Sequence, residues 1–209
     1  MAQFPDFVRI VEVGARDGLQ NEAAVSTQDK VALINALADA GLKDIEAGAF
    51  VSPKWVPQMA DSSDVISALN LPNVNLSALT PNLRGAEAAK QVGIQEFAIF
   101  TAASEAFCQK NINCSIDESI DRFKDVMDFA KANNIRVRGY VSCVMGCPYQ
   151  GDVDYNDVLK VSKRLLELGC YEISLGDTIG VGTAKKVDEL LDLLLQHIDK
   201  SKLAVHFHD

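Results

Sequence analysis

Short apolar segments alternate with longer segments of helical periodicity along this chain. The short segments are rich in Val, Ile, Leu and Phe, a composition typical of strands that are buried on both faces. Seven candidate strands occur, at residues 8–13, 45–50, 74–79, 97–101, 137–141, 173–175 and 203–207. Between most of them apolar residues recur at helical spacing, as in Val31, Ile34, Leu37, Ala38 and Leu42; in Ile120, Phe123, Met127 and Ala130; and in Val158, Val161, Leu165 and Leu168. This alternation predicts βα units around a parallel sheet.

The ends of the predicted helices carry matching signals. Ser26 and Asp29 have the spacing of a capping box at the start of one helix. Three helices end in a glycine, then an apolar residue, two further positions and the next strand; these glycines are Gly41, Gly93 and Gly169. Asn134 occupies a similar position, since Asn also tolerates the left-handed backbone that closes a helix. The same helix-to-strand joint is therefore used repeatedly.

The strand count points to one fold class. Seven βα-type strands without a GxGxxG turn favour a (β/α)8 TIM barrel over a Rossmann sheet, because residues 14–18 lack the spacing that holds a pyrophosphate. Such barrels typically need about 250 residues, and this chain has 209. We therefore expect an α/β barrel truncated to about seven strands. Residues 1–209 would form a single catalytic domain that lacks the eighth unit and tail, as a piece of a longer protein or completed by another chain.

Composition narrows the function classes. The chain has 20 Lys plus Arg against 29 Asp plus Glu, a net charge of −9 and a pI near 4.8, which argues against a nucleic-acid partner. Hydrophobic residues make up 48%, as in a globular enzyme, and no apolar run reaches the length of a membrane span. The start MAQFPDF has no signal-peptide pattern, so we expect a soluble cytoplasmic protein. Five scattered cysteines indicate reduced thiols rather than a disulfide framework.

Three carboxylates interrupt the predicted apolar strands. Glu12, Glu46 and Asp177 each lie in or at the end of a strand. Burial of an ionised carboxylate without a partner is costly, so each should meet a cation, a metal ion or hydrogen-bond donors. A structural alternative is a buried ion pair with Arg9 or Arg138. Three such groups on different strands favour a functional site.

Two of the three histidines, His206 and His208, lie two residues apart on the last predicted strand. Alternate strand residues point to the same side, so both imidazoles should face one way. Asp17 follows the first strand and could complete a ligand set with them at the barrel mouth, where Mg²⁺, Mn²⁺, Fe²⁺ or Zn²⁺ would fit. Arg16 would then be a fixed cation beside the metal, suited to stabilising an oxyanion. The alternatives are a satisfied core histidine and an Arg-Asp surface pair; His197 follows no such pattern.

Four segments closely resemble the 3-hydroxy-3-methylglutaryl-CoA lyase family. They are Glu12-Val13-Gly14-Ala15-Arg16-Asp17-Gly18-Leu19-Gln20-Asn21-Glu22, Ser142-Cys143-Val144-Met145-Gly146-Cys147-Pro148-Tyr149, Ser174-Leu175-Gly176-Asp177-Thr178-Ile179-Gly180 and Val205-His206-Phe207-His208-Asp209. Arg-Asp-Gly alone would indicate only the wider metal-dependent superfamily of aldolases and Claisen-type enzymes. The longer segments, in this order, are specific to the lyases.

The resemblance implies a metal-dependent retro-Claisen cleavage of 3-hydroxy-3-methylglutaryl-CoA to acetoacetate and acetyl-CoA. It assigns metal ligation to Asp17, His206 and His208 and stabilisation of the acetyl thioester enolate to Arg16. Acidic active-site positions match Glu12, Glu46 and Asp177, and Gln20 matches a polar residue near the substrate. The expected cofactor is a divalent cation, Mg²⁺ or Mn²⁺ first. A homodimer of the full-length protein and a role in leucine degradation are further implications.

The sequence departs from the family pattern in two respects. Ala15 stands where a proline is common, which we expect to be harmless. The family's catalytic cysteine and an asparagine metal ligand both fall beyond residue 209, as does most of the usual phosphate-binding region. Cys147 follows the fifth strand and matches a different family segment, so it receives no catalytic role.

Three other functions compete with the lyase. A related aldolase or Claisen-type synthase acting on 2-oxo acids would share the Arg-Asp start and the paired histidines. A metal hydrolase of the amidohydrolase kind would place its histidine pair on the first strand rather than the seventh. A non-catalytic remnant that binds a metal or a partner is the third. Chelator-sensitive turnover and the identity of the products separate these possibilities.

Overall fold

A computed structural model describes residues 7–208. Its contacts fall into two compact units, the first made of residues up to Thr80 with Glu87–Glu96 and the second of Pro81–Ala86 with Phe97 onward. Each unit is described by itself. The expectation of one catalytic domain over residues 1–209 stays a prediction.

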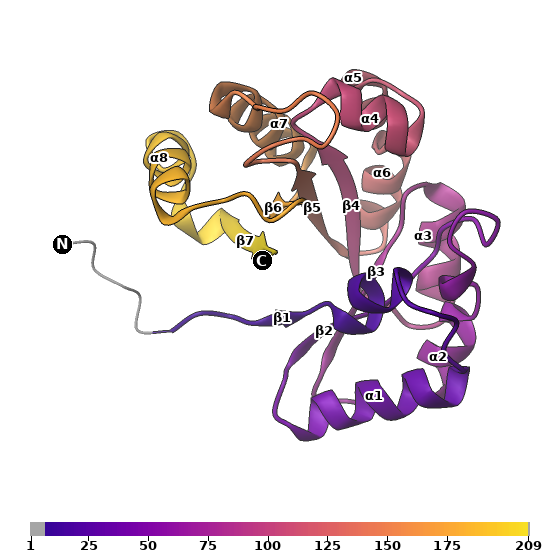
Figure 1. Ribbon diagram of the computed structural model, residues 1–209. Coiled ribbons are helices and arrows are strands. Elements are labelled where there is room, and N and C mark those ends of the chain that lie inside the picture. The colour runs from indigo at the N-terminus through magenta and orange to yellow at the C-terminus, as the bar shows by residue number, and fades with distance from the viewer. Residues whose placement is uncertain (1–6, 209) are drawn as a thin grey trace. The chain divides into compact units, whose positions relative to one another are not determined.

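The first unit carries three parallel strands in chain order, with helices between them (Figure 1). Val11 pairs with Asp44 at the start of β2, and β2 pairs with β3 along its length, from Asp44 with Asn75 to Ala49 with Leu79. Its elements are β1 (Val11–Glu12), the π-helical turn η1 (Gly14–Gly18), α1 (Thr27–Asp39), β2 (Asp44–Ala49), the 3-10 turn η2 (Pro57–Met59), α2 (Ser62–Ala68) and β3 (Asn75–Leu79). The unit boundary runs through α3 (Leu83–Gln91) and β4 (Glu96–Ala102).

The second unit repeats the same arrangement (Figure 1). Strands β5, β6 and β7 are parallel neighbours, with Tyr140 paired to Ser174 and Ser174 to Ala204. Its remaining elements are α4 (Glu105–Ile112), α5 (Ile116–Arg122), α6 (Lys124–Ala132), β5 (Arg136–Ser142), α7 (Tyr155–Leu168), β6 (Glu172–Asp177), α8 (Ala184–Leu194), the 3-10 turn η3 (Lys200–Lys202) and β7 (Leu203–Phe207). All seven predicted strands are therefore confirmed.

The predicted helix-to-strand joints are confirmed by their backbone angles. Gly41, Gly93 and Gly169 have φ values of 101°, 90° and 116°, and Asn134 has a φ of 56°. A left-handed residue there costs glycine little and redirects the chain into the next strand. At the start of α1, the Ser26 side chain accepts a hydrogen bond from the backbone N–H of Asp29, as its sequence position indicates.

Two elements differ from the sequence prediction. The first strand is shorter than residues 8–13, because Val8 and Ile10 lie exposed ahead of β1. The single helix expected around Ile120 and Met127 is divided into α5 and α6 at Phe123, which is the C-cap of the first and the N-cap of the second. The N–H of Phe123 donates to the carbonyl of Ile120, three residues back, at 3.2 Å, so a tighter turn interrupts the helix that periodicity predicts as continuous.

Each unit has an apolar core beneath its strands. Ile34 of α1 and Ile45 of β2 are fully buried in the first unit. In the second unit Phe97 of β4 is fully buried and stacks on Phe129 of α6, with ring centroids 6.5 Å apart. All five cysteines are free and buried, as expected of reduced thiols. Within residues 7–208, none of the helices has the length and apolar character needed to cross a membrane.

A buried lysine ties α1 to the segment that leads into α2. Lys30 Nζ lies 2.5 Å from Asp61 Oδ1 and donates to the carbonyl of Gln58, while Thr27 donates to Asp61 Oδ2 at 2.6 Å. Lys30 is buried and the Asp61 side chain is 24% exposed. Desolvation opposes ionisation of Asp61, but the hydrogen bonds from Lys30 and Thr27 outweigh it and lower the pKa of the carboxyl group.

The Lys30–Asp61 pair should make the folded protein less stable in acid. Because the pKa of Asp61 is lower in the folded state than in the unfolded chain, its stabilisation is present above the ordinary aspartate pKa of about 3.9 and is lost as the pH falls through the folded value. Asp61→Asn should remove this part of the acid sensitivity. Urea unfolding at pH 6 and pH 3 checks it: equal losses of unfolding free energy in both proteins would contradict the prediction.

Candidate active site

The turn after β1 fixes the first pair of site residues. The backbone N–H groups of Arg16 and Asp17 both donate to the carbonyl of Val13, at 3.0 and 2.6 Å, which winds the chain into η1. The N–H of Gly14 donates to Glu12 Oε1 at 2.5 Å. A Cβ at position 14 would lie 2.7 Å from that oxygen, so the contact requires glycine. Glu12 is therefore bound to the backbone of the turn that carries Arg16 and Asp17.

Arg16 is the centre of a connected polar cluster in the first unit. Its side chain is buried and forms an ion pair through Nε with Glu46 of β2, which is fully buried. Its Nη1 lies 2.8 Å from Asp17 Oδ1, and the amide of Gln20 donates to the same oxygen at 2.9 Å. The guanidinium is thus held by two carboxylates, and Asp17 is oriented by two donors. Such a fixed cation can stabilise negative charge without first reorganising.

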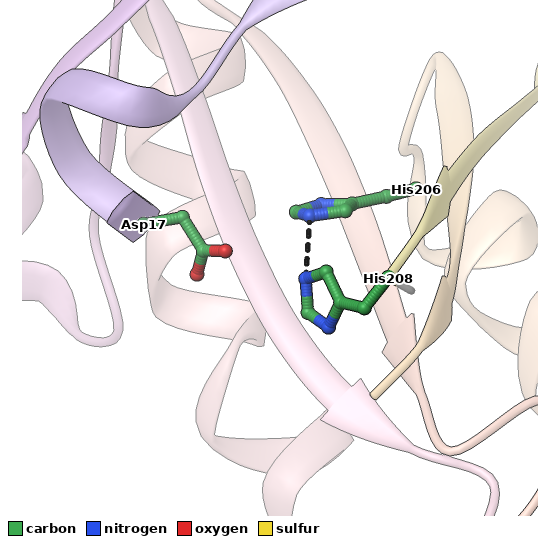
Figure 2. A group of neighbouring side chains, drawn as sticks. All are labelled: Asp17, His206 and His208. Atoms are coloured by element: carbon green, nitrogen blue, oxygen red, sulfur yellow. Dashed lines mark hydrogen bonds between the residues drawn. The ribbon is translucent and has the colours of Figure 1, made fainter. Parts of the chain in front are cut away.

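The side chains of His206 and His208 contact each other in the second unit. The two Nε2 atoms lie 3.0 Å apart and the rings are nearly perpendicular (Figure 2). His208 Nδ1 lies 3.3 Å from the carbonyl oxygen of Thr178. A carbonyl only accepts, so this contact assigns the proton of His208 to Nδ1 and leaves its Nε2 as an acceptor for the N–H of His206. Figure 2 also draws Asp17, which belongs to the first unit.

The two imidazoles have the chemistry of a cation site. Neutral imidazole nitrogen is a common metal ligand, and the two Nε2 atoms, 3.0 Å apart, are close enough to contact one ion. The histidine pair therefore has suitable donors for a divalent cation.

Asp177 lies at the end of β6 and is buried. Its two oxygens accept from the backbone N–H groups of Val181 and Gly182, at 3.2 and 2.6 Å. The next residue, Thr178, accepts from the N–H of Cys143 at 2.8 Å. Sequence reasoning gave Thr178 no role, although its place directly after a barrel strand is the signal that could have identified it.

Two cysteines after β5, Cys143 and Cys147, have thiol pKa values shifted in opposite directions. Burial raises the pKa of Cys143 to about 12. Burial also opposes ionisation of Cys147, but hydrogen bonds from Ser104 and from the backbone of Gln150 and Tyr149 lower the pKa of its thiol. Ser104 Oγ lies 3.0 Å from the Cys147 sulfur.

The structure distinguishes the predicted acidic residues by their partners. Glu46 meets a cation, Arg16, whereas Glu12 and Asp177 are bound to backbone N–H groups. The two arginines considered as structural partners have other carboxylates: Arg9 pairs with Asp44 and Glu96, and Arg138 with Glu172. Asp209, part of the last similar segment, lies outside the described residues.

Known proteins resemble this chain over nearly all of its length. A family model described as HMGL-like matches residues 7–209. The 3-hydroxy-3-isohexenylglutaryl-CoA/hydroxy-methylglutaryl-CoA lyase of Pseudomonas aeruginosa is 54% identical over 207 residues, which cover 98% of this chain and 69% of the relative. The mitochondrial hydroxymethylglutaryl-CoA lyase of Gallus gallus is 54% identical over 208 residues, covering 99% of this chain and 70% of the relative.

Two solved structures superpose on this chain over nearly all of its length. Hydroxymethylglutaryl-CoA lyase from Pseudomonas aeruginosa superposes with a TM-score of 0.96 and 54% identity, over 98% of this chain and 69% of that one. An HMG-CoA lyase from Acinetobacter baumannii, in complex with coenzyme A and 3-methylmalate, has a TM-score of 0.92 and 31% identity, over 100% of this chain and 68% of that one. The expected fold class, an α/β barrel truncated to about seven strands, is confirmed.

The cluster around Arg16 generates a stability prediction. Glu46→Gln removes the charge that faces the buried guanidinium, and we expect the free energy of unfolding to fall by about 1–3 kcal/mol. Asp121→Asn is the matched control, because its ion pair with Lys124 is exposed and should contribute little. Urea unfolding of both variants checks this, and equal effects would contradict the importance of the buried pair.

Proposed function

The chain belongs to the HMGL-like family, and on that premise we propose that the protein is a carbon–carbon lyase that cleaves 3-hydroxy-3-methylglutaryl-CoA to acetoacetate and acetyl-CoA. The observation that carries the proposal is 54% identity, over nearly the whole chain, to proteins named as lyases of this substrate. A related lyase that binds coenzyme A adds support for an acyl-CoA substrate. Because the chain spans about two thirds of these relatives, the activity is proposed for the whole protein.

Arg16 is suited to stabilise the negative charge that develops when the carbon–carbon bond of the substrate breaks. Cleavage removes the proton of the substrate's tertiary hydroxyl, breaks the bond between C2 and C3, and sends that electron pair to the thioester oxygen. The resulting enolate of acetyl-CoA takes up a proton at carbon. A guanidinium fixed by Glu46 and Asp17 can stabilise the enolate oxygen as its charge develops.

Asp17, His206 and His208 are the residues that would hold a divalent cation. The support is the donor chemistry, one carboxylate and two imidazoles, and the closeness of the two histidine nitrogens, 3.0 Å apart. Such a cation supplies Lewis-acid chemistry, since it acidifies a hydroxyl bound to it. Gln20 orients the Asp17 carboxylate through its 2.9 Å hydrogen bond. Mg²⁺ or Mn²⁺ is the proposed cation.

A second candidate substrate carries a longer branch at C3. The Pseudomonas aeruginosa relative is named for cleavage of 3-hydroxy-3-isohexenylglutaryl-CoA as well, and this chain is as similar to it as to the chicken lyase. The two substrates share the 3-hydroxyglutaryl-CoA part and differ in the branch at C3. Comparing their kcat/KM values decides between them.

Three further proposals rest on the sequence and the resemblance. They are a cytoplasmic location, a homodimer of the full-length protein, and participation in leucine degradation. The vertebrate relative is named as mitochondrial, so location is expected to vary among related proteins. Cell fractionation, light scattering and growth on leucine test them in turn.

The lyase activity predicts a specific pattern of loss. The protein, produced from its complete reading frame, should release acetoacetate from 3-hydroxy-3-methylglutaryl-CoA with Mg²⁺ or Mn²⁺. Asp17→Asn and His206→Ala should each lower kcat/KM at least about 100-fold, since each removes a proposed metal ligand. A coupled assay for acetoacetate measures both values.

Matched controls separate loss of a ligand from loss of the fold. His197→Ala removes an exposed histidine, and Asp154→Asn keeps a residue able to cap α7. Both should retain full activity. Turnover of a 2-oxo acid in place of the CoA thioester would indicate the related aldolases or synthases and contradict the proposed substrate.

Metal removal gives an independent prediction. Treatment with EDTA followed by desalting should abolish acetoacetate release, and Mg²⁺ or Mn²⁺ should restore it. The nitrogen couplings of bound Mn²⁺, measured by pulsed electron paramagnetic resonance, should report imidazole ligands in the unmodified protein and decrease in His206→Ala. Full activity after complete removal of divalent cations would contradict the proposed metal centre.

A further inference from the structure

The turn after β6 is organised by a buried carboxylate. Asp177 is 1% exposed, and its Oδ2 accepts from the N–H of Gly182 at 2.6 Å, while Oδ1 accepts from Val181 at 3.2 Å. A Cβ at position 182 would lie 2.8 Å from Oδ2, so glycine is needed for this approach. The N–H of Gly180 donates to the Asp177 carbonyl at 3.3 Å. Residues 177–182 therefore form a turn closed around one carboxylate.

Thr178, the second residue of that turn, connects the ends of three strands. Its hydroxyl oxygen accepts from the N–H of Cys143 after β5 at 2.8 Å. Its carbonyl oxygen lies 3.3 Å from Nδ1 of His208, which follows β7. Thr178 itself directly follows β6. The position of one backbone carbonyl therefore depends on the side chains of Asp177 and Thr178.

That carbonyl determines which nitrogen of His208 is presented to its surroundings. With the proton held at Nδ1, the lone pair is at Nε2, the atom that lies 3.0 Å from His206 Nε2. Partners that hold the second nitrogen of a ligating histidine fix its tautomer and ring orientation. Loss of the turn would leave His208 able to rotate or to exchange its proton between the two nitrogens.

We propose that Asp177 and Thr178 are positioning residues for His208, and that Asp177 acts by closing the turn rather than by transferring a proton to the substrate. The proposal rests on the metal centre described above and changes the role expected of Asp177 from the sequence. Both carboxylate oxygens accept backbone N–H groups, a structural use of the charge that needs no proton exchange. Thr178 acts through its hydroxyl, which anchors the turn to β5.

The test uses substitutions that alter one atom at a time. Asp177→Asn replaces one acceptor oxygen by a donor, so a backbone N–H loses its partner. Thr178→Val removes the hydroxyl at nearly constant volume, and Thr178→Ser keeps it. Asp154→Asn, at the exposed start of α7, is the control for an aspartate to asparagine change outside the site. Thermal unfolding verifies that each variant is folded.

Two readouts do not depend on turnover. The ¹⁵N shifts of the His208 ring in metal-free protein report its tautomer, with the signal assigned by its absence from His208→Ala. Titration with Mn²⁺ alone, followed by electron paramagnetic resonance, gives the dissociation constant. We expect the proton to be on Nδ1 in the unmodified protein and in Thr178→Ser, and to be distributed over both nitrogens in Asp177→Asn and Thr178→Val. Mn²⁺ binding should weaken about 10- to 100-fold in the latter two variants.

The outcomes separate this proposal from the proposed function. A folded Asp177→Asn protein with unchanged tautomer and Mn²⁺ affinity, but a lower kcat and an altered pH profile, would overturn the positioning role and indicate proton transfer. Unchanged values in Thr178→Val would overturn the role of Thr178. If the unmodified protein bound no Mn²⁺, the proposed metal centre would fail, and the tautomer measurement would still decide whether the turn holds His208.

Discussion

The buried ion pair between Arg16 and Glu46 fixes how the turn after β1 lies against β2. A carboxylate within β2 needs a cation, and a guanidinium in the turn after β1 needs a carboxylate, because neither charge is tolerated alone in a buried environment. Satisfying both fixes the path of the chain between β1 and α1. It also fixes Asp17, which follows Arg16 and pairs with its guanidinium. The same contacts that neutralise the buried charges therefore also hold Arg16 and Asp17 in the positions that the proposed site needs.

The second unit also contains a buried carboxylate, which is bound by backbone N–H groups. Asp177 is as deeply buried as Glu46, yet it meets N–H groups of its own turn instead of a cation. Both arrangements give the buried carboxylate hydrogen-bond donors, but they position different groups. An ion pair orients a side chain that can act on a substrate, whereas a closed turn orients the backbone carbonyl of Thr178, which in turn contacts His208.

Much of this arrangement could be predicted from the sequence, because apolar periodicity and left-handed joints are local signals. The seven strands, the turns at Gly41, Gly93 and Gly169, and the position of the histidine pair all follow from them. The break at Phe123 could not be predicted, since apolar residues keep their helical spacing across it. The roles of Asp177 and Thr178 depend on atoms brought together from three strand ends, which no spacing along the chain reveals.

The parallel pairing of each strand with its neighbour in the chain has a consequence for synthesis. In the first unit, β1 pairs with β2 and β2 with β3, so these pairings become possible once about eighty residues have left the ribosome. Each pairing joins residues of consecutive strands, Val11 with Asp44 and Asp44 with Asn75, and needs no segment from later in the chain. The Arg16–Glu46 pair lies within this early segment. The nascent chain can therefore pair these two buried charges before the histidines at the other end have been translated.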